Sequence, residues 1–450
     1  MIANIKQVFL IGIGGIGMSA LARYFKHQGL LVFGYDKTKT GLTEQLEQEG
    51  IAVFYADNPD LLPEVFKSHH SDALVIYTPA VPQHLQIVRV VKAAGYRLYK
   101  RSEVLGMISK QHFTIAVAGT HGKTTTSSMI AHILTHSGYG CSAFLGGIAV
   151  NYNSNVLFGD NQVVVVEADE FDRSFLTLHP NIAVVTSMDP DHLDIYGDLR
   201  HLIESFALFI AQVAADGKRI IRKGLDLPTD ISYGVETIAD AHGDNVQVLD
   251  GVFQFDYHFG DQVVSQIKLG AAGKHNVENA IAAITVAKLL RIDDGAIKTA
   301  LATYKGVKRR FEFIVKKEDQ VYIDDYAHHP EELKACLSAV RALYPHEQIT
   351  CIFQPHLFSR TRDFAAGFAE VLAMADTLIL MDIYPAREEP IAGVTSQWLL
   401  DQVRLKDKCL LDAEGILRYV KERRPKVLLT VGAGDIDLMV KPLKEVLTDV

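Results

Sequence analysis

Residues 113–126 read FTIAVAGTHGKTTT, and this stretch decides the predicted fold. A run of apolar and β-branched residues, typical of a buried strand, leads into a glycine-rich turn and then into a threonine-rich helix start. In such a turn the backbone amides and the Lys123 ammonium hold nucleotide phosphates, while the Thr124 hydroxyl faces Mg²⁺. Val117 stands where the full phosphate-loop pattern has a glycine. A solvated helix start is the structural alternative, but it would explain neither the apolar strand nor the two glycines.

The first glycine-rich loop along the chain lies near its start, so the loop at residues 119–124 is the second. Residues 7–17 read QVFLIGIGGIG, in which Gly12, Gly14 and Gly17 form G-x-G-x-x-G directly after a strand pattern. Asp36 follows at the end of the next apolar run, where its carboxylate can accept a hydrogen bond from a ribose hydroxyl. This arrangement predicts a site for a dinucleotide or a nucleotide-sugar. A tight turn between strand and helix, with no ligand, is the structural alternative.

Length and composition describe a globular chain without disordered tracts. The 450 residues are 48% hydrophobic and 22% charged, with a formal net charge of −9 and a pI near 6.1. This balance offers no basic face for nucleic acid or for an anionic membrane. The four cysteines lack C-x-x-C spacing, and no apolar run reaches the roughly 18 uninterrupted residues that a membrane span requires. We therefore expect a cytoplasmic protein.

Strand and helix patterns alternate through three blocks of the chain, which predicts an α/β protein with largely parallel sheets. We place the three domains at residues 1–107, 108–305 and 306–450. The second block becomes richer in short alternating strands after residue 218 and ends in the helical HNVENAIAAITVAKLL. Several strands end in glycine or polar residues, and ligands of open α/β sheets bind at that edge.

Two acidic motifs follow apolar strands of the second block. The strand QVVVV leads directly into EADE, which contains Glu167, Asp169 and Glu170. The next strand leads into DPDHLD at residues 189–194, with His192 among the aspartates. Carboxylates that emerge together at one sheet edge suit Mg²⁺, which prefers oxygen, so chemistry alone favours these acids over the histidine. Helix capping and loop solvation are the structural alternative for most of them.

The third block supplies cations and imidazole rings rather than a nucleophile. VKRRFE carries Arg309 and Arg310, and DDYAHHP places two aspartates and two histidines before a helix that Pro330 starts. In QPHLFSRTRD, a histidine and two arginines leave a strand end together. Arginines at such an edge suit recognition of a carboxylate or a phosphate. The sequence contains no Ser-His-Asp order and no zinc-type spacing.

Taken together, these motifs resemble those of the Mur ligases, ATP-dependent enzymes that form amide bonds in peptidoglycan precursors. The likeness rests on GTHGKTTT, EADE, DHLD, HNVEN, RRFE and DDYAHHP in this order, and it covers essentially the whole chain. The resemblance implies an N-terminal Rossmann-like domain that binds a UDP-sugar. It also implies a central P-loop ATPase-like domain with a mixed or parallel sheet, and a C-terminal Rossmann-like domain that contacts the amino acid and ATP.

Four segments are most similar to the branch of the family that adds L-alanine, namely GIGGIGMSALA, DDYAHHP, FQPHLFSRTRDF and DIYPAREEPIAG. Several later branches use a lysine downstream of the DH motif to help hold the metal, but no lysine occurs between His192 and Lys218. This departure argues against the branches that add glutamate or diaminopimelate. The related branch that reattaches a recycled tripeptide stays open as the alternative ligase.

The resemblance also implies roles for individual residues. ATP binding is implied for Gly119, Thr120, Gly122, Lys123, Thr124, Thr125, Asn276, Asn279, Arg310 and Asp325. UDP-sugar binding is implied for Gly12, Gly14, Gly15, Gly17 and Asp36, and amino-acid binding for Tyr326, His329, His356 and Arg360. The implied metal ligands, for Mg²⁺ or Mn²⁺, are Thr124, Glu167 and His192, and the implied catalytic set is Lys123, Glu167, His192, Arg310 and His329. Leu357 departs from relatives that carry arginine at this place.

The activity that the resemblance implies is the ATP-dependent joining of L-alanine to the lactyl carboxylate of UDP-N-acetylmuramate through an acyl phosphate. The partners would be these three small molecules, without nucleic acid or membrane, and the protein would be a monomer or a weak homo-oligomer. Two other classes of function are weaker alternatives. A nicotinamide oxidoreductase would leave the second glycine loop idle, and a non-catalytic nucleotide switch would leave the intact Lys123 and Arg310 unexplained.

Overall fold

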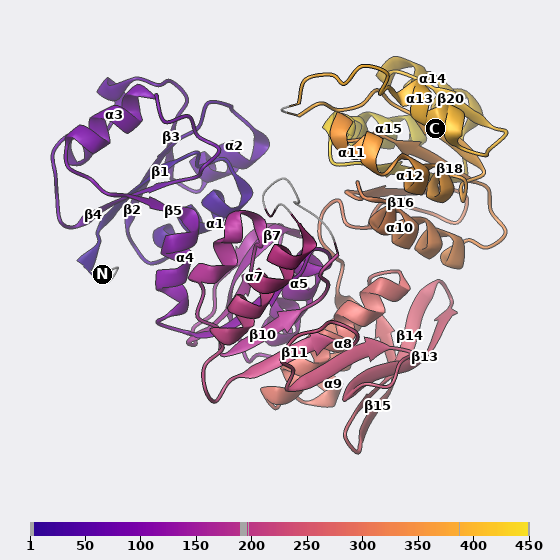
Figure 1. The fold of residues 1–450 in the computed structure, drawn as a ribbon, viewed down its shortest axis with the longest axis horizontal. Coiled ribbons are helices and arrows are strands. Elements are labelled where there is room, and N and C mark those ends of the chain that lie inside the picture. Colours follow the sequence, from indigo (N-terminus) through magenta and orange to yellow (C-terminus); the bar gives the residue numbers. More distant parts are fainter. Residues whose placement is uncertain (1–3, 190–195, 197, 387, 449–450) are drawn as a thin grey trace. The chain divides into compact units, whose positions relative to one another are not determined.

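The computed structural model describes residues 4–189, 196, 198–386 and 388–448. The chain forms two compact units. The first consists of Met1–Gly243, Tyr257–Val264 and Asn279–Leu301, and the second of Asp244–Asp256, Ser265–Glu278 and Ala302–Val450. The strands form three sheets, and helices alternate with the strands along the chain (Figure 1). This arrangement confirms the predicted α/β class. Within the described residues, no helix combines the length and the apolar character needed to cross a membrane.

The first sheet has five parallel strands in the order β3-β2-β1-β4-β5. Its strands are β1 (Gln7–Ile11), β2 (Leu31–Tyr35), β3 (Ala52–Phe54), β4 (Ala73–Tyr77) and β5 (Leu98–Lys100). The helices of this segment are α1 (Ile16–His27), α2 (Gly41–Gln48), α3 (Gln86–Ala93) and α4 (Arg101–Ser109), with short 3₁₀ turns at Pro59–Leu61 and Glu64–Phe66. Because β2 and β4 flank β1, the strand order reverses there, which is where open α/β sheets bind ligands. The first glycine loop follows β1 at this point.

The second sheet has ten strands in the order β15-β14-β13-β12-β11-β10-β6-β9-β7-β8. They are β6 (Phe113–Ala118), β7 (Ser142–Ala149), β8 (Ser154–Leu157), β9 (Val163–Glu167), β10 (Ile182–Val185), β11 (Lys218–Arg222), β12 (Ile231–Val235), β13 (Ala241–Leu249), β14 (Val252–Phe259) and β15 (Gln262–Leu269). The helices of this segment are α5 (Lys123–His136), the 3₁₀ helix η4 (Phe171–Thr177), α7 (Leu199–Ala211), α8 (Lys274–Leu289) and α9 (Asp294–Thr303). β9 and β10 flank β6 in parallel register, with Val117 opposite Glu167 and Ala118 opposite Val185. The loops that follow these three strands therefore open at the same edge.

The third sheet has six strands in the order β16-β17-β21-β18-β19-β20, all parallel except β16. The strands are β16 (Glu312–Lys316), β17 (Val321–Asp325), β18 (Ile349–Phe353), β19 (Thr377–Leu380), β20 (Lys408–Leu410) and β21 (Val427–Val431). The helices are α10 (Pro330–Leu343), α11 (Phe358–Asp363), α12 (Ala365–Leu372), α13 (Ser396–Gln402), α14 (Ala413–Arg423), the 3₁₀ helix η5 (Asp435–Met439) and α15 (Val440–Thr448). The central strands β17, β18 and β21 are buried along their whole length, as expected of parallel strands covered on both faces.

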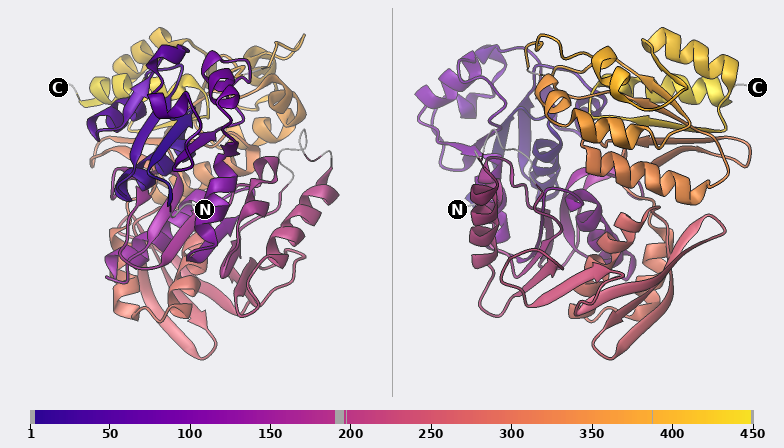
Figure 2. Two further views of the ribbon diagram at one scale, coloured as in Figure 1. Left: turned by 90° about the vertical axis from the view of Figure 1, so that its left-hand side faces the viewer. Right: turned by 45° about the vertical axis from the view of Figure 1, so that its right-hand side comes forward.

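Buried polar contacts tie α1 to the edge of the second sheet within the first unit. Arg23 Nη1 donates a hydrogen bond to Asn155 Oδ1 at 2.6 Å, and Asn155 Nδ2 donates to the Ile16 carbonyl at 2.5 Å. The rings of Tyr24 and Phe144 pack beside them with centroids 5.2 Å apart, inside one continuous apolar core. These contacts hold the two glycine loops in one packed body, whose indigo and purple segments Figure 2 shows from two further directions.

Candidate active site

The phosphate-type loop lies between β6 and α5, as its sequence predicts. Gly119 and Gly122 have φ angles of +139° and +81°, in the region that favours glycine. A Cβ on Gly119 would come within 2.8 Å of the Ser187 amide nitrogen, and one on Gly122 within 2.7 Å of Asn279 Oδ1. No side chain caps the start of α5, so its first amides are available to an anion, which a helix N-terminus attracts.

Lys123, the first residue of α5, pairs with a buried carboxylate. Its ammonium lies 2.7 and 2.8 Å from the two Glu170 oxygens and 2.5 Å from the Gly119 carbonyl oxygen. Burial acts to lower the pKa of Lys123, but attraction to Glu170 and two neighbouring carboxylates outweighs burial and raises that pKa. Lys123 therefore keeps its positive charge at a site with little exposure to water, where it interacts strongly with anions.

Thr124 and Glu167 lie next to each other at the same edge. Thr124 Oγ1 donates to Glu167 Oε1 at 3.0 Å, and the Gly146 amide donates to Glu167 Oε2 at 2.8 Å. Burial raises the pKa of Glu167, although the nearby ammonium and these hydrogen bonds oppose the rise. A hydroxyl and a carboxylate are the hard oxygen ligands that Mg²⁺ prefers, so this pair fits a magnesium site. His192 and the rest of DHLD lie outside the described residues, and their share in metal binding stays a prediction.

The loop after β10 braces the phosphate-type loop. Ser187 Oγ accepts from the His121 amide at 2.7 Å and lies 2.9 Å from the Thr120 hydroxyl. The Thr120 hydroxyl oxygen also accepts from the Asp189 amide at 3.0 Å. Ser187 is not among the residues that the sequence predicts for the site. Its position just after a buried parallel strand is the signal that indicates it.

The backbone of the first glycine loop is hydrogen-bonded to the Asp36 carboxylate. Asp36 Oδ2 accepts from the Gly14 amide at 2.9 Å, and Oδ1 accepts from the Thr38 amide at 3.1 Å. A Cβ on Gly14 would lie 2.8 Å from Asp36 Oδ2, so this approach requires glycine. Gly15 is the N-cap of α1 and brings no capping side chain. The contact of Asp36 with a ribose hydroxyl stays a prediction.

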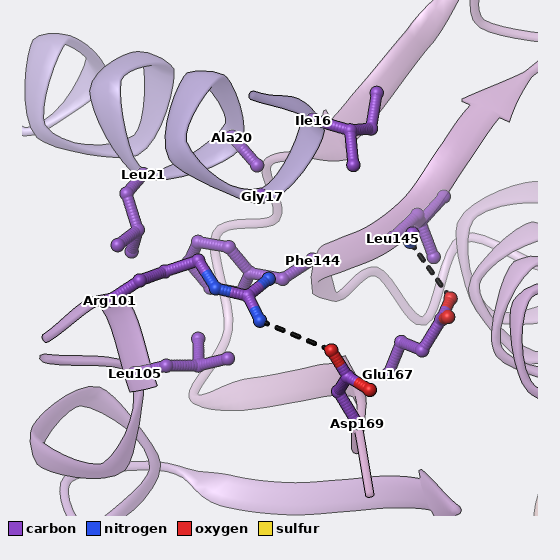
Figure 3. Close-up of a pocket in the computed structure, with 11 residues that line it drawn as sticks. Ile16, Gly17, Ala20, Leu21, Arg101, Leu105, Phe144, Leu145, Glu167 and Asp169 are labelled. Carbon is purple, nitrogen blue, oxygen red and sulfur yellow. Dashed lines mark hydrogen bonds and ion pairs between the residues drawn. The ribbon is translucent and has the colours of Figure 1, made fainter. Parts of the chain in front are cut away.

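A cavity of about 170 Å³ lies beside the first glycine loop in the first unit (Figure 3). Its lining residues are Ile16, Gly17, Ala20, Leu21, Arg101, Leu105, Phe144, Leu145, Gly146, Glu167 and Asp169. They come from α1 and α4 on one side and from β7 and the end of β9 on the other. The cavity therefore extends from the helix of the first glycine loop to Glu167. Arg101, which no sequence motif singles out, points into it and lies 3.4 Å from Asp169.

The two arginines of RRFE have different surroundings in the second unit. Arg309 donates to the fully buried Asp324 carboxylate at 3.1 Å and to a backbone carbonyl at 2.7 Å. The Arg310 guanidinium lies 3.7 Å from Glu332, and its side chain is 35% exposed. Both guanidinium groups lie over the Tyr326 ring, 5.2 and 5.1 Å from its centroid. Arg309 is thus held in the fold, and Arg310 is the more accessible of the two.

Asp325 ends β17 in a buried position. Its carboxylate accepts from the Phe311 and Ala327 amides, each at 2.7 Å. Burial raises the pKa of Asp325 to about 6, while the positive charge of Arg310 opposes the rise. The contact of this carboxylate with the ribose of ATP stays a prediction.

The two asparagines of HNVEN belong to different units. Asn279 is in the first unit, where its Oδ1 accepts from the Thr126 hydroxyl at 3.2 Å. Asn276 is in the second unit, where its Nδ2 donates to the Ala272 carbonyl at 2.6 Å. Asn279 is therefore placed beside the phosphate-type loop, and the role of Asn276 at ATP stays a prediction.

The predicted amino-acid residues follow strands of the third sheet. His329 is the N-cap of α10, and its Nδ1 accepts from the Glu331 amide at 3.4 Å. A neutral ring whose Nδ1 accepts carries its proton on Nε2, which makes that nitrogen a donor. Burial lowers the pKa of His356 to about 4, so this ring is neutral at pH 7. Leu357 precedes α11, the helix of Arg360, with a φ of +68° that is rare for a bulky residue.

Three family models match the chain in order. They are "Mur ligase family, catalytic domain" over residues 7–113, "Mur ligase middle domain" over residues 117–287, and "Mur ligase, glutamate ligase domain" over residues 309–434. Together they span most of the chain.

Individual proteins match over nearly the full length. Proteins named UDP-N-acetylmuramate–L-alanine ligase from Flavobacterium psychrophilum and Flavobacterium johnsoniae are 49% and 48% identical, covering 99% of this chain and 99% of each relative. The solved structure of a UDP-N-acetylmuramate-alanine ligase from Thermotoga maritima has a TM-score of 0.81 at 27% identity, with 98% of both chains covered. A murein peptide ligase from Psychrobacter arcticus shares the fold, with a TM-score of 0.69 at 21% identity over 99% of both chains. By these matches and by its motifs, the chain belongs to the Mur ligase family.

Proposed function

We propose that this protein is an ATP-dependent ligase that joins L-alanine to the lactyl carboxylate of UDP-N-acetylmuramate in peptidoglycan precursor synthesis. The observation that carries the proposal is the cluster of Lys123, Thr124 and Glu167. This cluster connects a phosphate-type loop to the cavity beside α1. Similarity over nearly the whole chain to proteins named for this activity supports the choice of substrates.

The first step transfers a phosphoryl group to the carboxylate. A lactyl carboxylate oxygen attacks the γ-phosphorus of ATP, the bond to the β-phosphate oxygen breaks, and an acyl phosphate and ADP result. Lys123 and the amides of α5 hold the β- and γ-phosphates and offset their charge. Thr124, Glu167 and His192 would hold Mg²⁺, which would supply further neutralisation of negative charge when bound. Arg310 stabilises the charge on the transferred group.

The second step forms the amide bond. The alanine amine attacks the acyl carbon, a tetrahedral intermediate forms, and its collapse expels inorganic phosphate with the electrons of the C–O bond. The amine must lose a proton, which the departing phosphate is basic enough to accept. His329 presents Nε2–H and so orients the reactants rather than removing this proton, while Arg360 pairs with the alanine carboxylate beside Tyr326 and His356. No side-chain nucleophile takes part.

The test is a substrate comparison at saturating ATP, Mg²⁺ and UDP-N-acetylmuramate. Phosphate release is measured with L-alanine, with the L-Ala-D-Glu-diaminopimelate tripeptide, and with neither. We expect release that requires both L-alanine and UDP-N-acetylmuramate and that is lost in Lys123→Ala. Release with the tripeptide alone would assign the protein to the recycling branch, and release with neither acceptor would refute a ligase of this class.

A further inference from the structure

The guanidinium group of Arg101 lines the cavity, although Arg101 belongs to none of the sequence motifs. It is the first residue of α4, directly after β5, and its side chain reaches across to the loop after β9. Figure 3 shows Arg101 and Asp169 projecting toward each other, with Glu167 beside them. A Cβ on Gly17 would collide with the Arg101 guanidinium, so the group lies against the backbone of α1. Arg101 therefore stands between the first glycine loop and Glu167.

The charges around the cavity are unequal. Among the described residues that line it, Arg101 is the only basic side chain, whereas Glu167 and Asp169 are both acidic. Lys123 is not among the lining residues and is already paired with Glu170. Part of the cavity wall is apolar and consists of Leu21, Leu105 and Phe144. Charged groups beside such a wall interact more strongly than they do in water, because the dielectric constant is lower there. An anionic group that enters this cavity toward Glu167 needs a cation, and Arg101 supplies it.

The pairing of Arg101 with Asp169 is loose enough to exchange. The distance of 3.4 Å exceeds the roughly 2.7–2.9 Å of a strong charge-assisted hydrogen bond. Both side chains are partly exposed, at 31% and 39%. Asp169 Oδ1 also accepts from the Phe171 amide at 3.1 Å, so the carboxylate keeps a partner when the guanidinium turns away. A ligand carboxylate in fork geometry would give Arg101 two short hydrogen bonds in place of one long one.

We propose that Arg101 binds the reacting carboxylate of the sugar nucleotide, and that it exchanges Asp169 for this carboxylate when the substrate enters. The inference rests on the proposed function, because it takes the lactyl carboxylate of UDP-N-acetylmuramate as the ligand. The pyrophosphate of the same substrate is the other oxyanion within its reach. The carboxylate is favoured because the Nη2 that reaches Asp169 is on the side of Glu167, away from the glycine loop.

The experiment compares two ligands that differ in this carboxylate. UDP-N-acetylmuramate and UDP-N-acetylglucosamine share the nucleotide, the pyrophosphate and the sugar ring, but only the first carries the lactyl group. Their dissociation constants are measured by calorimetry, without alanine, for the wild type, Arg101→Lys, Arg101→Gln and Arg97→Gln. Arg97 is a control arginine that is 65% exposed and pairs with Glu103 outside the cavity.

We expect Arg101→Gln to weaken UDP-N-acetylmuramate about tenfold or more, the effect of losing one charge-assisted pair. Arg101→Lys should weaken it less, and UDP-N-acetylglucosamine should stay within about twofold because it lacks the carboxylate. Arg97→Gln should change neither constant. Equal weakening of both ligands would assign Arg101 to the pyrophosphate and overturn the proposal, as would no change in either.

A second variant covers the case in which Arg101→Gln fails to fold. Asp169→Asn removes the competing carboxylate and leaves Arg101 in place, so we expect it to bind UDP-N-acetylmuramate at least as tightly as the wild type. If the ion pair served only the fold, Asp169→Asn would weaken the ligand. If binding of UDP-N-acetylmuramate depends on Arg101 but no ligation product forms, the proposed ligase reaction alone is refuted. If the product forms but binding does not depend on Arg101, this inference alone is refuted.

Discussion

Lys123 at the start of α5 and Glu170 after β9 form an ion pair of 2.7 Å between side chains that are only 14% and 1% exposed. The pair joins positions 47 residues apart in the sequence. It holds the ammonium beside the phosphate-type loop, so a phosphate that binds there must share the ammonium with Glu170 or displace the carboxylate.

Removing the carboxylate of this pair should destabilise the protein and make its stability depend more on ATP. Glu170→Ala leaves a buried ammonium unpaired, which we expect to lower the free energy of unfolding by roughly 3–5 kcal/mol in urea. Glu170→Gln should cost less, because its amide oxygen still accepts a hydrogen bond. Since the phosphates of ATP replace the missing anion, ATP should raise the Tm of Glu170→Ala more than that of the wild type. Equal Tm shifts would contradict this account of the pair.

The contact between Thr124 and Glu167 predicts a selective loss of metal affinity. Thr124→Val removes the hydroxyl but keeps the branched shape, whereas Thr124→Ser keeps the oxygen. We expect Thr124→Val to raise the Mg²⁺ concentration for half-maximal activity roughly tenfold, the effect typical of losing one polar partner at a metal site. Thr124→Ser serves as the control and should stay close to the wild type. A titration in which both variants shift alike would exclude the hydroxyl as the cause.

Replacing Gly119 and Gly138 by alanine should have different effects, because only Gly119 is closely surrounded by other atoms. Both have positive φ, at +139° and +78°, but a Cβ on Gly138 meets no atom within 4 Å, while one on Gly119 collides with the Ser187 loop. Gly138→Ala should lower stability by about 1–2 kcal/mol, the strain of the left-handed conformation alone. Gly119→Ala should lower it further and also raise the KM for ATP. Unfolding curves and ATP kinetics of the two variants, taken side by side, check this; an unchanged KM for ATP in Gly119→Ala would argue against the loop as the phosphate site.

His132 should make the protein less stable in acid. Burial lowers its pKa to about 4, and its Nε2 lies 3.0 Å from the Ala300 carbonyl oxygen. Because the unfolded chain takes up this proton near pH 6.5 and the folded chain only near pH 4, stability falls as the pH drops between these values. Replacing it by glutamine should remove about 2 kcal/mol of the stability difference between pH 7 and pH 5. A glutamine variant that keeps the wild-type difference between pH 7 and pH 5 would contradict this account of His132.

ATP should bring the two units together. Lys123 belongs to the first unit and Arg310 and Asp325 to the second, so a nucleotide site that uses all three requires both units to contribute. We expect small-angle scattering to show a smaller radius of gyration with a non-hydrolysable ATP analogue and UDP-N-acetylmuramate together. Lys123→Ala should show no such change. Identical scattering of the wild type with and without ligands would refute ligand-driven closure.

The sequence by itself determined the parts of the site that depend on local backbone geometry. Glycines at 119 and 122 fix the turn before α5, and the apolar runs before it and before Glu167 form parallel neighbours whose ends meet. For this reason Thr124 and Glu167 could be assigned to one edge from the printed residues alone. Periodicity and turn chemistry act over a few residues, and such patterns remain visible in a single sequence.

Only the tertiary structure decided which distant side chains meet. Arg101 and Asp169 are 68 positions apart, and their contact depends on the packing of α1 and α4 against the second sheet. Contacts within the second unit likewise distinguish Arg309, which pairs with the buried Asp324, from the more accessible Arg310, although the two look equivalent in RRFE. A side-chain contact across elements depends on the rotamers and the close packing of every layer between them, so no pattern within one segment specifies it.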